Sequence, residues 1–178
     1  MKITIVNVVA TMDLGLEVDL GILIKAANVT YNPSRYACAY IKGPSTYGKV
    51  SVFPTGKLIS VGTKSLAQAK QDLDYASGVI AAIFGTDNKN NPIRLRNIIC
   101  VVEMVRPLDL EVIAKNLESA MYEPEQFPGI IWHPKDFEAT ILLFSSGKAV
   151  VSGLKNTISV AELPNYLTKK LQRYFLIG

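Results

Sequence analysis

The chain has 178 residues, of which 49% are hydrophobic and 19% charged, with a net charge of +4 and a pI of about 9.0. This length and composition supply the core of one domain or of two half-domains, and they exclude global disorder. A modestly basic balance is compatible with nucleic-acid binding without proving it, and the cations are scattered along the chain.

Other classes of protein are disfavoured. No apolar run reaches the ~20 residues of a membrane span, and the N-terminus reads as a strand instead of a signal peptide. Cys38 and Cys100 lie in strand-like stretches, which favours buried thiols in a reducing compartment. The one histidine, His133, has no evident nucleophile partner, metal-ligand spacing is absent, and neither Gly-Lys pair (56–57, 147–148) has the pattern of a phosphate loop. We therefore expect no enzyme, no cofactor and no metal.

In the first half, a β-branched strand over 3–11 precedes a predicted helix over 19–28, with Asp19 as its cap. Three short strands follow, separated by Pro and Gly, at 36–42, 47–53 and 57–62. A long helix over 66–83 closes this half.

The second half repeats this order after a turn-rich linker, predicted at 87–92. A strand is expected over 94–104 and a helix over 109–120, capped by Asp109. Strands are expected at 129–133, 138–144 and 148–153. The last helix is predicted over 160–175 with Pro164 in its first turn, where a missing N–H costs nothing.

The two halves are also similar in sequence. "FPTGKLISVG" at 53–62 matches "FSSGKAVVSG" at 144–153, and at the same offset Tyr36 aligns with Phe127. Asn7 aligns with Asn97 at an offset one residue shorter. Solenoid repeats are shorter and more numerous than this. The pattern predicts a pseudo-twofold domain of two repeats, 1–86 and 93–178. Its class is α+β, with one curved antiparallel sheet continuous across the dyad and helices on one face.

One face of that sheet has an unexpected composition. Strand alternation puts the following side chains on it: Lys49, Ser51, Phe53, Lys57, Ile59 and Val61, then Thr140, Leu142, Phe144, Lys148, Val150 and Ser152. An antiparallel sheet with helices on its other side should be polar here. Two explanations remain open: a second subunit covers the face, or the face is an apolar binding surface. The paired Asn and flanking Lys favour a surface for the minor groove of DNA.

These residues resemble the TATA-box-binding protein family. The segments "NVVATMDLG", "YNPSRY", "TGKLISVGTKS", "YEPEQFPG" and "LLFSSGKAVVSG" match the family in order and spacing, over essentially the whole chain. The resemblance implies a saddle-shaped sheet whose concave face lies in a widened minor groove, with helices on the convex face. It also implies four aromatic wedges that kink the DNA, at Tyr36, Phe53, Phe127 and Phe144.

The resemblance assigns further roles by position. The groove floor would be contacted by Asn7, Val9, Thr11, Ile59, Val61, Asn97, Ile99, Leu142, Val150 and Ser152. Phosphates would be contacted by Arg35, Lys42, Lys57 and Lys148. Glu123, Glu125 and Gln126 match positions that contact a transcription factor B-type initiation factor, and through it the RNA polymerase machinery. When no DNA is bound, the concave face could support self-association.

Some positions depart from the family pattern. Tyr36 stands where Phe is usual, Val61 where Thr is usual and Ser51 where Leu is usual. Val101 replaces a small polar residue, and His133 and Asp136 replace basic residues. The expected function is a general transcription factor that binds A·T-rich promoters and nucleates the preinitiation complex. The alternative is a diverged paralogue that acts mainly as a protein-interaction module. The expected location is the nucleus, or the cytoplasm if the chain is archaeal.

Overall fold

The computed structural model describes residues 1–87 and 91–176, and these ranges hold ten strands and four α-helices. The chain divides into two compact units. Unit N comprises residues 7–96, and unit C comprises residues 1–6 with 97–178. Strands β1 (Lys2–Asp13) and β6 (Ile93–Glu103) therefore each contribute residues to both units. The predicted linker, 87–92, lies partly outside the described residues.

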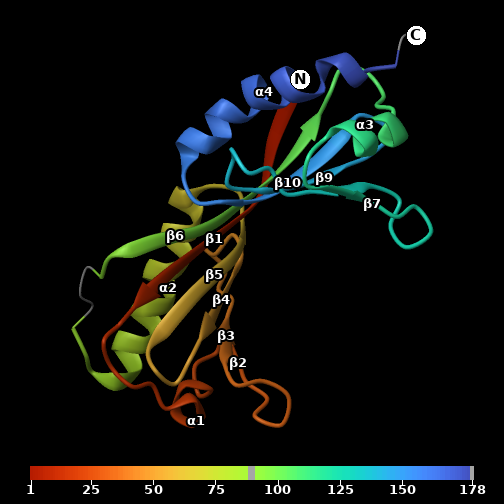
Figure 1. Cartoon of the computed structure of the whole chain (residues 1–178). Helices are drawn as coiled ribbons and strands as arrows, with labels where there is room; N and C mark the ends of the chain where they lie inside the picture. Colours follow the sequence, from red (N-terminus) through yellow and green to blue (C-terminus); the bar gives the residue numbers. More distant parts are fainter. Residues whose placement is uncertain (88–90, 177–178) are drawn as a thin grey trace. The chain divides into compact units, whose positions relative to one another are not determined.

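Unit N holds an antiparallel sheet in the order β2-β3-β4-β5-β1. Its further strands are β2 (Val29–Thr30), β3 (Ala39–Ile41), β4 (Lys49–Val52) and β5 (Lys57–Thr63). The short helix α1 (Leu20–Leu23) precedes β2, and the long helix α2 (Leu66–Phe84) packs on β4 and β5 (Figure 1).

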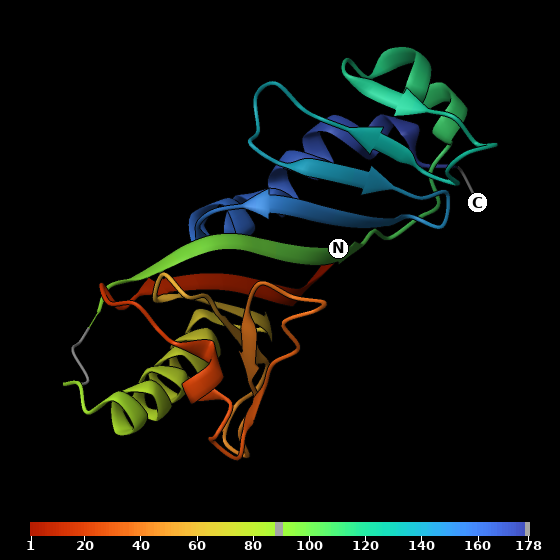
Figure 2. The same ribbon diagram turned by 90° about the horizontal axis from the view of Figure 1, so that it is seen from below.

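Unit C repeats the arrangement in the order β6-β10-β9-β8-β7. Its further strands are β7 (Ala120–Tyr122), β8 (Ile130–Trp132), β9 (Thr140–Leu143) and β10 (Lys148–Leu154). Helix α3 (Leu110–Asn116) precedes β7, and α4 (Thr157–Leu171) leads into a 3-10 turn (Gln172–Tyr174). Figure 2 looks onto strands β8 to β10, with α4 behind them.

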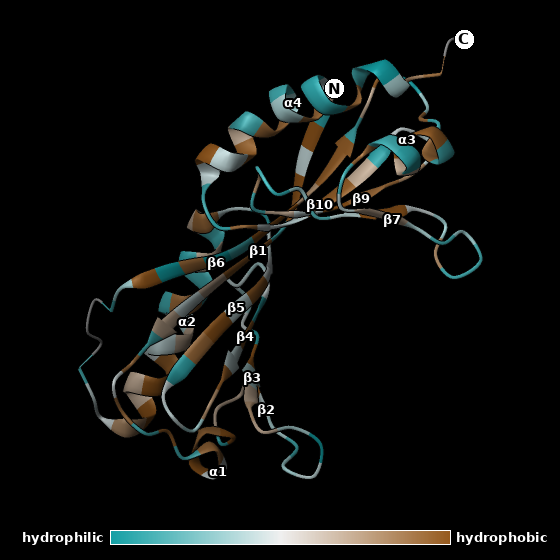
Figure 3. Cartoon of the chain, in the orientation of Figure 1, coloured by the Kyte–Doolittle hydropathy of each residue, from teal (hydrophilic) through white to brown (hydrophobic). Residues whose placement is uncertain are grey.

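The core of each unit lies between the sheet and its long helix. Alternate strand residues face the helix and are fully buried, for example Val50 and Leu58 in unit N and Ile141 in unit C. On α4 the buried residues Leu163, Leu167 and Leu171 recur every fourth position, which is one face of a helix. Figure 3 shows the same pattern, with apolar colour along the strands and polar colour on the outer side of α4.

Helix α2 is fixed at both ends and in its middle. The Ser65 side chain caps its first turn, and Gly85 ends it in the left-handed conformation, φ 64°. The buried carboxylate of Asp72 accepts hydrogen bonds from the backbone N–H groups of Tyr47 and Gly48, both at 2.8 Å. This carboxylate ties the helix to the loop that precedes β4.

The two short helices differ from their predicted lengths. Asp19 caps α1 as predicted, but the helix ends at Leu23 and does not extend over 19–28. Its buried residues are Leu20 and Leu23, and the chain turns at Ala26 to enter β2. Asp109 likewise caps α3, which ends at Asn116 instead of residue 120 because the chain becomes extended before β7. The predicted helices are therefore too long, and the two-to-three-residue strands β2 and β7 were not predicted.

The position of Pro164 also differs from the prediction. The Asn156 side chain caps α4 by accepting a hydrogen bond from the Ser159 N–H at 2.8 Å, so the helix begins at Thr157. Pro164 consequently lies inside the helix and not in its first turn. Having no N–H, it leaves the carbonyl one turn earlier without its helical donor.

Two other predictions are confirmed. Both hairpins, β4–β5 and β9–β10, have the predicted facing, since Ser51 pairs with Ile59 and Leu142 pairs with Val150. Cys38 and Cys100 are free and buried, and burial raises the pKa of the Cys100 thiol.

Among the described helices, none combines the length and hydropathy needed to cross a membrane.

Candidate nucleic-acid interface

Each sheet has one face opposite its long helix, called here the open face, and its side chains are mostly half-buried. In unit N it comprises Asn7, Val9, Thr11, Ser51, Phe53, Ile59 and Val61; in unit C it comprises Asn97, Ile99, Val101, Leu142, Phe144, Val150 and Ser152. Thr11 is the exception, being 7% exposed. The predicted floor residues therefore do gather on one face within each unit.

The two asparagines of this face have matching hydrogen bonds. Asn7 Oδ1 accepts from the Gly62 N–H at 2.8 Å, and Asn97 Oδ1 accepts from the Gly153 N–H at 2.8 Å. A backbone N–H can pair only with the oxygen of the amide, so this bond fixes the orientation of each side chain. The Nδ2 groups are then the donors left to serve a ligand on the open face.

The glycines in these bonds lie at β-bulges. The β1–β5 register shifts between Val8 and Ala10, opposite Gly62, and the β6–β10 register shifts between Val151 and Leu154, at Gly153. Both glycines adopt positive φ, 88° and 91°, which other L-residues rarely adopt. Each bulge leaves one N–H without a ladder partner, and the asparagine supplies one. The signal in the sequence is the recurrent Gly that ends both copies of the repeated motif.

The four predicted wedges divide between the units, two in each, and their rings have different neighbours. In unit C, the Phe127 and Phe144 rings meet edge to face, with centroids 5.8 Å apart. In unit N, Tyr36 is 47% exposed and its ring meets Tyr40 instead, with centroids 5.5 Å apart. Tyr40, which also has the Lys49 ammonium 4.0 Å above its ring, was missed by the sequence analysis.

One position beside these rings differs between the units. A Cβ on Gly129 would lie 3.0 Å from the Phe127 ring and 3.1 Å from the Phe144 ring. The absence of a side chain at this position therefore lets the two rings meet. The aligned residue in unit N is Cys38, 91 positions earlier, whose side chain is 8% exposed. Unit N therefore has a side chain at the position where unit C has none.

The predicted phosphate-contacting cations are all exposed: Arg35, Lys42, Lys57 and Lys148. Lys57 and Lys148 begin β5 and β10, at the ends of the two hairpins. Lys148 lies 3.9 Å from the carboxylate of Glu103, a loose pair with both side chains largely exposed. Such a pair contributes little energy and leaves the ammonium available to a phosphate.

Two further cations were missed. Arg94 and Arg96 are exposed and, with Lys57 and Thr11, line a recess of about 190 Å³ in unit N. Arg96 Nε donates to the Thr11 hydroxyl at 2.9 Å, which accounts for the burial of Thr11. Strand alternation puts both arginines on the side of β6 opposite the open-face Asn97, so no pattern in the sequence indicated this contact.

The predicted partner-binding residues lie in the loop between β7 and β8. Glu123, Glu125 and Gln126 are exposed. The loop is closed by the Glu123 carbonyl, which accepts from the N–H groups of Gln126 and Phe127, both at 2.9 Å. One tight turn thus presents the acidic side chains and fixes the backbone of Phe127 at its end.

Two residues that replace expected basic groups have partners within unit C. His133 Nδ1 lies 3.2 Å from the Thr140 hydroxyl. Asp136 accepts from the Tyr166 hydroxyl at 2.7 Å and pairs with Lys170 at 2.7 Å, both on α4. These contacts, led by the Lys170 ammonium, lower the pKa of Asp136. In the part of the chain that the structure describes, no cluster of His, Cys, Asp or Glu could hold a metal ion.

Fold and faces together define a class: an α+β protein of two similar repeats, each presenting an open sheet face with apolar side chains and one fixed amide. The chain matches the family described as "Transcription factor TFIID (or TATA-binding protein, TBP)" over residues 2–83 and 92–174. The chain belongs to this family.

Individual relatives agree with this assignment. The chain is 34% identical to the TATA-box-binding protein of Pyrococcus abyssi, over 99% of this chain and 93% of the relative. It is 31% identical to that of Thermococcus celer, over 100% and 95%. A solved structure, Methanococcus jannaschii TBP, superposes with a TM-score of 0.82 at 26% identity, covering 97% of this chain and 99% of the other. The predicted family and fold class are confirmed, as is the expectation of a non-enzyme.

Proposed function

We propose that the chain is a general transcription factor that binds TATA-like DNA in the minor groove through its two open faces. The main support for this proposal is the pair of asparagine amides, Asn7 and Asn97, which are fixed by hydrogen bonds and share the open face with apolar side chains. The relatives that bear the name TATA-box-binding protein support the same reading.

The chemistry of the open face fits the floor of an A·T-rich groove. A·T pairs present only acceptors there, adenine N3 and thymine O2, and each asparagine keeps its Nδ2 donor for them. Val9, Ile59, Ile99 and Val150 have no polar group to offer. A G·C pair would place its exocyclic amino donor against these side chains and leave it unpaired, which costs about 1–3 kcal/mol.

The aromatic pairs supply the kinks in this proposal. Phe127 with Phe144 in unit C, and Phe53 with Tyr36 in unit N, each enter between two base pairs and replace lost stacking. Unstacking costs a few kcal/mol per step, and the wider contact of the bent DNA offsets it. Phe127 and Phe144 already support each other as a pair, whereas Tyr36 is held by Tyr40 and has to reorient.

The exposed cations contact phosphates at the edges of the groove. Arg35, Lys42, Lys57 and Lys148 are the family positions, and we add Arg94 and Arg96. The positions aligned with these two arginines are neutral, Thr4 and Val6, so the extra charge belongs to unit N alone. Arg96→Val, which copies the aligned residue, is expected to reduce any preference for one orientation on an asymmetric duplex.

The acidic loop serves assembly in the same proposal. Glu123, Glu125 and Gln126 contact a transcription factor B-type initiation factor, which recruits the RNA polymerase machinery. The named relatives come from archaea. This favours the cytoplasmic alternative of the predicted location over the nucleus.

The test compares three duplexes of equal length by fluorescence anisotropy. One carries a TATA-like element, one replaces its A·T pairs by G·C, and one replaces them by inosine·C, which lacks the minor-groove amino group. We expect tight binding to the TATA-like and inosine duplexes and weak binding to the G·C duplex. Equal affinity for all three would contradict minor-groove recognition. It would favour the alternative of a module that acts mainly through proteins.

A further inference from the structure

We propose that unit C carries a second binding site, distinct from the DNA face, that accepts a short acidic peptide segment of a protein partner. The site is a cavity of about 650 Å³. Its walls are the end of α3, strand β8, the loop after β8 and the end of α4 with the turn that follows. A volume of this size accommodates a small ligand or a few side chains.

The cavity lies on the helix side of the sheet. Trp132 lines it and is 2% exposed, so its side chain points into the layer between β8 and α4. The preceding residue, Ile131, faces the other way and pairs with the open-face Leu142. A ligand in this cavity therefore does not compete with DNA for the same side of unit C.

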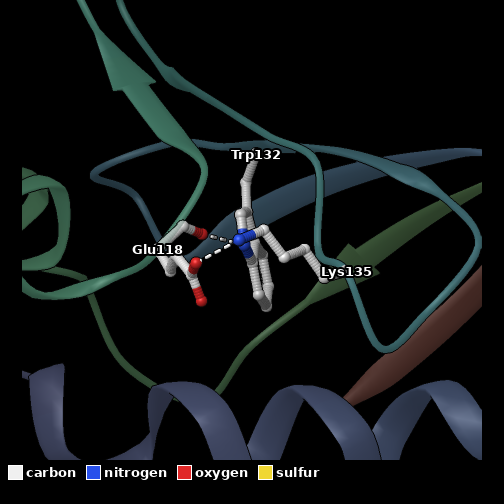
Figure 4. A network of polar contacts seen from close by, with 3 residues as sticks. All are labelled: Glu118, Trp132 and Lys135. Carbon is white, nitrogen blue, oxygen red and sulfur yellow. Dashed lines mark hydrogen bonds and ion pairs between the residues drawn. The ribbon is translucent and has the colours of Figure 1, made fainter.

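The cavity is more positive than negative. Four cations line it, Lys135, Lys169, Lys170 and Arg173, against two carboxylates, Glu118 and Asp136. Lys135 pairs with Glu118, as Figure 4 shows, and Lys170 pairs with Asp136 at 2.7 Å. Among the described residues, Lys169 and Arg173 have no carboxylate partner. One lysine at the end of α4 would suffice to offset the helix dipole. The two cations without a carboxylate partner in the described part of the chain, Lys169 and Arg173, can therefore pair with two carboxylates of a ligand.

The cavity is also preformed and partly apolar. The Trp132 indole Nε1 donates to the Glu118 carbonyl at 3.2 Å (Figure 4), and its ring stacks on Tyr166 with centroids 5.8 Å apart. Leu117 and Pro134 add apolar surface. A ligand whose carboxylates pair with Lys169 and Arg173 can therefore bury an apolar side chain between them. This combination describes a peptide in which acidic residues flank an apolar one.

Nucleic acid fits the site less well. Glu118 and Asp136 stand on the wall of the cavity, and a continuous phosphate chain would have to pass them. Asp136 is ionised at neutral pH like any exposed aspartate, and Lys170 and the Tyr166 hydroxyl lower its pKa further. A peptide can space its carboxylates to meet Lys169 and Arg173 and avoid both acids.

The chain offers its own reporter for the test, because Trp132 is its one tryptophan. We would titrate the full chain with an end-blocked hexapeptide of sequence EDLFDE and follow tryptophan emission at low salt. The competing probe is inorganic polyphosphate. The pocket variant is Lys169→Glu with Arg173→Glu. The matched control, Lys25→Glu with Lys64→Glu, makes the same charge change on exposed residues of unit N. Circular dichroism checks the fold, and Lys169→Ala with Arg173→Ala replaces the pocket variant if that does not fold.

We expect the peptide to bind saturably to the wild-type chain and to the control. Its Kd for the pocket variant should be about tenfold higher or more. DNA affinity of the pocket variant should equal that of the control. Equal peptide binding by all variants would overturn the proposal, because it would mean attraction by net charge alone. A lack of binding up to millimolar peptide would overturn it too. The proposal would also be overturned if the wild-type chain bound polyphosphate more tightly than the peptide and the pocket variant no longer bound polyphosphate.

Discussion

The two polar atoms of the Asn7 amide have separate roles, and a substitution that changes only one of these atoms can distinguish them. Its Oδ1 completes the bulge through the Gly62 N–H at 2.8 Å, and its Nδ2 is the donor assigned to DNA. Asn7→Asp keeps an oxygen for the bulge and replaces the donor by a charged acceptor. Asn7→Ala removes both groups.

The two substitutions should therefore affect thermal stability and DNA affinity differently. Asn7→Ala loses one exposed hydrogen bond worth about 1 kcal/mol, which lowers Tm by roughly 2–4 °C in a chain of this size. Asn7→Asp keeps that bond and should leave Tm near the wild-type value. In the complex, however, its carboxylate faces acceptors in a desolvated groove, at a cost of roughly 2–4 kcal/mol. The Kd for a TATA-like duplex should rise about 30- to 1,000-fold.

The assay pairs thermal melting by circular dichroism with anisotropy on the TATA-like duplex. Asn165→Asp, on the exposed side of α4, makes the same chemical change away from the open face and controls for the added charge. If Asn7→Asp binds DNA as tightly as this control, Nδ2 of Asn7 is not a donor to DNA. If Asn7→Asp loses as much stability as Asn7→Ala, the bond from the Gly62 N–H to the side-chain oxygen does not stabilise the bulge.

Three other predictions concern single positions. Gly129→Ala brings a Cβ within 2.7 Å of the Leu143 carbonyl and about 3 Å of both phenylalanine rings, so it should reduce DNA bending measured by energy transfer; an unchanged bend would contradict the paired wedge. Lys57→Ala should reduce the slope of log Kobs against log salt by about 0.9, and an unchanged slope would remove this residue from the phosphate contacts. Tyr166→Phe should raise the pKa of Asp136 toward its ordinary value, as read by NMR titration. The stability advantage of the wild type over Tyr166→Phe should be present at neutral pH and vanish as the pH falls through the folded pKa of Asp136; a pH-independent difference would contradict it.

Much of the fold could be predicted because the patterns are periodic and occur twice. The alternation around "GK" in both halves correctly gave the two hairpins and their facing. Caps were also readable, since Asp19 and Asp109 precede apolar residues at helical spacing. Helix ends were less predictable. Helix α1 ends after four residues although apolar residues continue beyond it, so the hydrophobic pattern did not mark its end.

What escaped prediction depends on contacts between distant residues. The bulges could not be located from alternation, because one extra residue in a strand looks like any other until its partner strand is known. The contact of Arg96 with Thr11 joins residues 85 positions apart. The difference between Gly129 and Cys38 was visible in the alignment of the halves, but its effect on the wedges needed ring positions. The roles of the wedges and of the acidic loop stay predictions.

The central claim, that this chain kinks A·T-rich DNA from the minor groove, is tested most directly by energy transfer between dyes at the two ends of a TATA-like duplex. A G·C-substituted duplex is measured in parallel, and both are titrated across a salt series. We expect a shortened end-to-end distance on the TATA-like duplex alone, lost as salt rises. Saturated binding that leaves the TATA-like duplex straight, or that shortens both duplexes equally, would contradict it.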